Sequence, residues 1–126
     1  MKTKNVKTNT LNSKALDWAV ATQKGLPIKH DPMGFKTGSQ AGFWVWEDVL
    51  YGKILLIGDN YSPSTDWAEG GAIIESEGIS LIKHDKWIAK TPNGVEVEGK
   101  TALIAAIRAF VVTNLGEEIE VPEQLL

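Results

Sequence analysis

One stretch near the middle of the chain concentrates hydroxyl, carboxylate and aromatic side chains of the kinds that bind ligands. It reads Tyr61-Ser62-Pro63-Ser64-Thr65-Asp66-Trp67-Ala68-Glu69-Gly70-Gly71. Ser64, Thr65 and Asp66 can hold the polar groups of a ligand. Tyr61 and Trp67 can form aromatic walls around the same ligand. The stretch is therefore a candidate pocket for a small molecule or a partner.

The same residue types are also typical of a rigid, self-capped turn, and both interpretations stay open. Asp66 and Glu69 have the spacing of a capping box, and Pro63 fixes the backbone before them. Arg108 favours the pocket, because it is a lone charge on an otherwise apolar helix and needs an acidic partner or an anionic ligand. We predict that Arg108 pairs with Asp66. The predicted binding residues are Tyr61, Ser64, Thr65, Asp66, Trp67 and Arg108.

A second motif satisfies the spacing of a phosphate-binding P-loop. It is Gly94-Val95-Glu96-Val97-Glu98-Gly99-Lys100-Thr101. In a true P-loop, backbone N–H groups wrap the phosphates. Here valine and glutamate alternate, which is typical of a strand, and the carboxylates would repel a phosphate. We expect Gly99 to end this strand and Thr101 to cap the helix that follows.

Metal and nucleophile chemistry have weaker signals. The tetrapeptide Ile-Lys-His-Asp occurs at 28–31 and at 82–85, and its histidines and aspartates could bind a metal. Neither pair has helical or finger spacing, and His84-Asp85 suits a hairpin turn. There is no cysteine and no Gly-x-Ser-x-Gly elbow, although Ser62 or Ser64 could meet His84 in space. We therefore predict no catalytic residue, no metal ligand and no cofactor.

Composition narrows the class of protein. A chain of 126 residues with 43% hydrophobic and 23% charged residues is typical of a single globular domain. It has no apolar run of membrane-spanning length and no h-region of a signal peptide. The absence of cysteine fits a reducing compartment. We expect a cytoplasmic protein that does not contact a membrane.

Charge is spread unevenly along the chain. The first ten residues carry Lys2, Lys4 and Lys7 without an acid, and we predict that residues 1–10 form a flexible basic arm before a single domain over 11–126. A net charge of −3 argues against a general nucleic-acid binder. A weak nucleic-acid-binding module that uses the arm remains an alternative.

Periodicity and turn residues predict the elements that position these motifs. Residues 27–42 are predicted as a loop, and Gly70-Gly71 as a break before a short helix. The strand at 43–47 has aromatic side chains on both faces, so Trp44 and Trp46 form a candidate surface for a protein partner. The helix at 101–115 is apolar nearly all round, which indicates burial or a homodimer. Helices are predicted over 12–24, 72–77 and 101–115, and strands over 43–47, 54–57, 79–83, 86–90, 95–98 and 120–122.

The order of these elements predicts an α+β fold, a mainly antiparallel sheet sandwiched between helices. Three segments also resemble a known family: Ala15-Leu16-Asp17-Trp18-Ala19-Val20-Ala21, residues 61–79 and residues 101–125. They resemble the NinX-like proteins of lambdoid phages and prophages, a family of unknown function, and the wider phage alpha-beta-alpha sandwich domain. The resemblance implies a phage-encoded accessory protein in the host cytosol, but no catalytic residues.

The sequence therefore favours a non-enzymatic binding protein. It would sequester a small anionic, nucleotide-like ligand or inhibit a host protein, and the phage setting suggests counter-defence. The alternatives are a small enzyme acting on a nucleotide-like substrate and the weak nucleic-acid-binding module.

Overall fold

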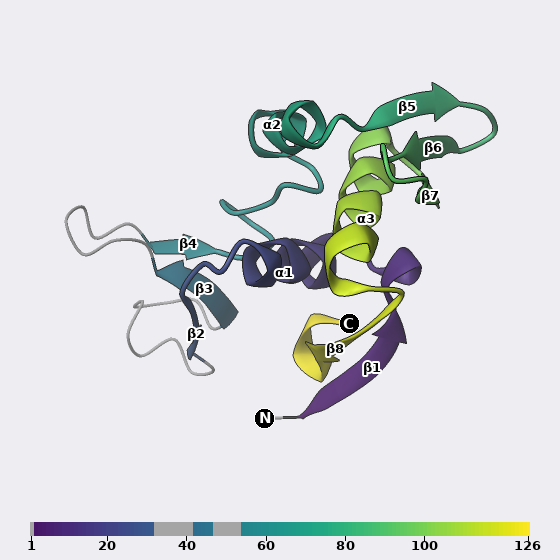
Figure 1. Ribbon diagram of the computed structural model, residues 1–126. Coiled ribbons are helices and arrows are strands. Elements are labelled where there is room, and N and C mark those ends of the chain that lie inside the picture. Colours follow the sequence, from purple (N-terminus) through teal and green to yellow (C-terminus); the bar gives the residue numbers. More distant parts are fainter. Residues whose placement is uncertain (1, 32–41, 47–53) are drawn as a thin grey trace.

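The structure is a computed structural model that describes residues 2–31, 42–46 and 54–126 (Figure 1). Its described part is α+β, as predicted, with the strands in three antiparallel sheets rather than one. The helices are α1 (Ser13–Gln23), α2 (Trp67–Glu77) and α3 (Ala102–Leu115), with short 3-10 turns η1 (Thr8–Thr10) and η2 (Glu123–Leu125). The first sheet pairs β1 (Thr3–Lys7) with β8 (Glu118–Pro122). The second has β2 (Ile28–Asp31), β3 (Gly42–Trp46) and β4 (Ile54–Leu56), and the third has β5 (Ser80–Lys83), β6 (Trp87–Lys90) and β7 (Glu96–Gly99).

Helix α3 is the element on which the others pack. It contacts the third sheet on one side and α1 and α2 on others (Figure 1). Thr101 caps it, because the Thr101 hydroxyl accepts a hydrogen bond from the Ile104 N–H at 3.1 Å. Its alanines Ala105, Ala106 and Ala109 are fully buried within the chain. Intramolecular packing therefore accounts for the apolar faces that had suggested a homodimer.

The residues that match the P-loop spacing, 94–101, serve to pack β7 against α3. Residues 96–99 form β7, and Gly99 lies so close to α3 that a Cβ atom there would collide with the backbone of Ala105. Gly99 thus ends a strand and Thr101 begins a helix, as expected from the alternation of valine and glutamate.

Helix α2 differs from its prediction. It runs without interruption from Trp67 through Gly70 and Gly71 to Glu77. Gly70 is buried against the carbonyl of Pro63 and the side chain of Leu103, where no Cβ atom would fit. The glycine is therefore needed for close packing and does not break the helix, since a glycine costs only about 1 kcal/mol in a helix.

Two segments predicted as irregular are strands. Residues 3–7, expected in a flexible arm, form β1 and pair with β8, and Thr8 after them is fully buried. Residues 28–31, expected in a loop, form β2 and pair with β3. Both strands gain order from long-range pairing, which local patterns do not reveal. No helix in the described ranges is long and apolar enough to cross a membrane.

Candidate functional site

The central motif is a self-capped turn between β4 and α2. The Asp66 carboxylate accepts a hydrogen bond from the Ala68 N–H at 3.0 Å and so caps α2. The Ser64 N–H donates to Oδ1 of Asp17 on α1 at 2.9 Å, and Pro63 is fully buried. These contacts hold the turn against the rest of the chain. They favour the structural interpretation of the motif over the pocket.

Asp17 is the buried carboxylate of this region, and the sequence argument missed it. Only 1% of its surface is exposed. Burial raises the pKa of Asp17 from 3.8 to about 6, while the N–H and hydroxyl of Ser64 act in the opposite direction and the charge of Glu69 adds to the rise. The signal was present in the helical spacing, because the apolar residues Val20 and Ala21, three and four positions after Asp17, share its face of the helix and are buried.

The predicted aromatic walls do not enclose a site together. Tyr61 is buried, whereas Trp67 is 59% exposed and its ring lies over Gly71 on the surface of α2. Thr65 is exposed as well. No residue from Tyr61 to Gly71 lines any of five cavities in the described parts of the chain.

Arg108 does not pair with Asp66, although both lie in the described part of the chain. Its guanidinium donates to the carbonyl of Leu11 at 2.8 Å, to the carbonyl of Glu98 at 2.9 Å and to Oδ1 of Asn12 at 2.8 Å. Burial lowers the pKa of Arg108 without neutralising it. The partners of this lone charge are therefore backbone and amide oxygens of its own chain.

The remaining candidates also lie apart. The side chain of Trp44 is only 8% exposed, and that of Trp46 lies outside the described residues. His30 stacks on Phe43 with ring centroids 4.2 Å apart, and its Nε2 lies 3.0 Å from Oε1 of Gln124. His84 is in the β5–β6 turn, as expected. Over residues 2–31, 42–46 and 54–126, no three side chains of metal-ligating type come together.

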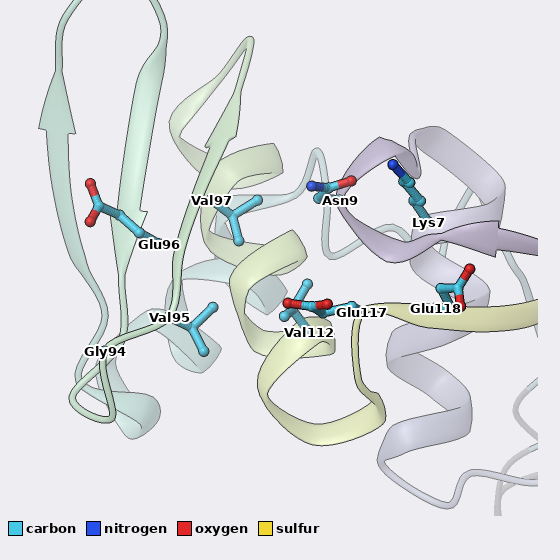
Figure 2. Close-up of a pocket in the computed structure, with 9 residues that line it drawn as sticks. All are labelled: Lys7, Asn9, Gly94, Val95, Glu96, Val97, Val112, Glu117 and Glu118. Carbon is cyan, nitrogen blue, oxygen red and sulfur yellow. The ribbon is translucent and has the colours of Figure 1, made fainter.

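The largest hollow of the five lies elsewhere, along β7. It has a volume of about 770 Å³, within the usual range of ligand sites. Figure 2 shows residues 94–97 on one side, Lys7 and Asn9 on the other, and Val112 of α3 between them. Glu117 and Glu118 complete the wall at the start of β8.

A second hollow of about 600 Å³ continues the first, because both are lined by Asn9, Glu96 and Val97. We call the two together the β7 groove. The charged lining of the first hollow is three glutamates and one lysine, so this half is acidic. The second hollow adds one acid, Glu98, and three cations, namely Lys86, Lys100 and the internally bonded Arg108. The groove therefore changes from acidic to more basic along β7.

The groove exposes an edge of the third sheet. The strand order β5-β6-β7 leaves one side of β7 without a neighbouring strand in the described residues. The Thr91 N–H donates to the Val95 carbonyl at 2.9 Å, so the backbone of Val95 faces the β6 side. Because this orientation alternates along a strand, the N–H and C=O groups of Glu96 and Glu98 point away from β6. Of these groups, the Glu98 carbonyl accepts a hydrogen bond from the Arg108 guanidinium.

Sequence reasoning missed this groove. The alternation at 95–98 predicted a strand with a solvated face, but the opposing wall comes from the two ends of the chain. Nothing local to β7 indicates that Lys7, Asn9 and Glu118 will face it.

A family model described as Bacteriophage P22, NinX matches residues 7–114 of the chain. A search of the curated proteins finds no match.

Proposed function

The chain belongs to the Bacteriophage P22 NinX family, and from this premise we propose that it is a non-enzymatic accessory protein that binds a host protein in the β7 groove. Acting in the host cytosol, it would inhibit or sequester that protein, with counter-defence as the setting. The observation that carries the proposal is the side of β7 that has no neighbouring strand among the described residues, beside the first hollow of the β7 groove, of about 770 Å³.

The charges of the site favour a protein over a small anion. Arg108, the cation expected to bind an anionic ligand, is held by Leu11, Asn12 and Glu98. The larger half of the groove is lined by glutamates, which would repel a nucleotide or a nucleic-acid backbone. An acidic wall beside apolar Val112 instead suits a partner segment that carries basic and apolar side chains.

The test is a charge reversal in the groove, matched by one outside it. Glu117→Lys with Glu118→Lys changes the acidic wall, whereas Glu75→Lys with Glu77→Lys makes the same change in charge on exposed residues of α2. Each variant is purified from the phage host and examined by native mass spectrometry. We expect the wild-type protein and the α2 variant to retain a stoichiometric host protein, and the groove variant to lose at least nine tenths of it.

A photo-crosslinking residue then locates the contact. Placed at Asn9, which lines both halves of the groove, it should link to the same host protein, and placed at Glu77 it should not. Retention of the partner by the groove variant, or crosslinks only from α2, would overturn the proposed function.

A further inference from the structure

We propose that the partner enters the acidic half of the β7 groove as an extended segment with alternating apolar and basic side chains, and pairs with β7 as a fourth strand of the third sheet. This inference rests on the proposed function and names the class of partner segment and its mode of binding.

The backbone of β7 supplies the pairing groups. The N–H and C=O of Glu96 and the N–H of Glu98 point into the groove and have no hydrogen-bond partner among the described residues. Such a row of backbone groups is the template that an added strand uses. At the other end of β7, the Glu98 carbonyl already accepts a hydrogen bond from the Arg108 guanidinium. Strand addition is therefore confined to the stretch from Gly94 to the Glu98 N–H, most of which lies in the acidic half.

The two faces of β7 set the side-chain pattern of the segment. Val95 and Val97 point toward Val112 of α3, and Glu96 points away from it (Figure 2). Residues directly opposite each other on paired strands share a face. Alternate side chains of the segment would thus lie over the three valines and should be apolar. The side chains between them would lie on the same face as Glu96 and should be basic. The ion pair that Glu96 already makes with Lys90 is exposed and long, at 4.0 Å.

A second copy of this chain fits the same edge poorly. Pairing two β7 strands would place Glu96 and Glu98 of one copy beside the same residues of the other. Like charges on directly opposed residues destabilise a strand pair. The edge therefore disfavours self-pairing and leaves a basic strand as the matching occupant.

Short synthetic peptides test this mode of binding on the intact protein. The probe is a nine-residue peptide of alternating valine and lysine. One control has glutamate in place of lysine, and another keeps the valine–lysine sequence with alternate backbone nitrogens methylated on the pairing edge. By fluorescence anisotropy, we expect the basic peptide to bind at least tenfold more tightly than either control. Binding should weaken as salt rises.

A proline substitution separates strand pairing from charge. Glu96→Pro removes an N–H that points away from β6, whereas Glu96→Gln removes the charge and keeps the N–H. We expect Glu96→Pro to weaken peptide binding at least tenfold and Glu96→Gln no more than threefold. Circular dichroism and thermal unfolding check that both variants fold, and peptide methylation gives the same information without changing the protein.

The outcomes distinguish this inference from the proposed function. If backbone methylation and Glu96→Pro leave binding of the basic peptide unchanged, or if that peptide does not bind at millimolar concentration, strand addition is wrong. The host-protein complex and its sensitivity to Glu117→Lys with Glu118→Lys could still hold in that case. A homodimer through β7 would also overturn the inference.

Discussion

At the scale of single residues, the polar groups on apolar helices turned out to hold the fold together. The positions of Arg108 and Asp17 on buried helix faces signalled that each needs a partner. The sequence could not identify the partner, because any of many carbonyls or amides can satisfy such a group. Arg108 joins α3 to Leu11, Asn12 and Glu98, and Asp17 joins α1 to the turn at Ser64.

The raised pKa of Asp17 has a consequence for stability. Below pH 3.8 the Asp17 carboxyl is protonated in both the folded and the unfolded chain, so its titration does not change the unfolding free energy there. Between 3.8 and about 6 the folded chain keeps a proton that the unfolded chain has released, so stability falls as pH rises. Above that range Asp17 is ionised in both states, and the folded chain has lost on the order of 2 to 3 kcal/mol of unfolding free energy relative to low pH.

Asp17→Asn removes this titration and keeps an oxygen that can accept from the Ser64 N–H. We expect the unfolding free energy of the wild-type protein, minus that of Asp17→Asn, to fall by about 2 kcal/mol between pH 4 and pH 7. Urea denaturation at a series of pH values measures it. Glu69→Gln, which removes a nearby charge that raises the pKa of Asp17, should reduce the fall. A difference that stays constant, or rises with pH, would contradict the assignment.

At the scale of elements, local signals predicted most helices and hairpins but not the strands that form by distant pairing. The helix caps at Asp66 and Thr101 were visible in the sequence and are confirmed. Strand β1 pairs with residues 118–122, more than a hundred positions away. No local pattern identifies such a partner, and a short polar segment therefore resembles a loose arm.

Two adjacent glycines of α2 offer a matched test of element packing. A Cβ atom at Gly70 would collide with the Pro63 carbonyl and the Leu103 side chain, whereas one at Gly71 would make ordinary contact with Trp67, at 3.8 Å. We expect Gly70→Ala to lower the unfolding free energy by about 1 to 3 kcal/mol. Gly71→Ala should raise it by about 0.5 to 1 kcal/mol, because alanine is the better helix former. Thermal unfolding of the two alanine variants is the measurement. Equal changes in unfolding free energy would contradict the close packing of Gly70 against Pro63 and Leu103.

At the scale of the whole molecule, the β7 groove exists because both ends of the chain meet opposite one hairpin. Lys7 and Asn9 come from the N-terminal part, Glu117 and Glu118 from the C-terminal part, and Val97 from the third sheet. The α+β class and the family could be predicted from the sequence. The site could not, since it depends on how the first and third sheets are placed around α3.

Amide hydrogen exchange at Glu96 and Glu98 tests the central claim most directly. Both N–H groups point into the groove without a partner among the described residues, so they should exchange rapidly in the free protein, unlike the amide of Val97. In the complex with the captured host protein, we expect exchange at Glu96 and Glu98 to slow at least a hundredfold. The amides of α2 should be unchanged. Protection at these two positions in the free protein, or rapid exchange in the complex, would contradict pairing of the partner with the open edge of β7.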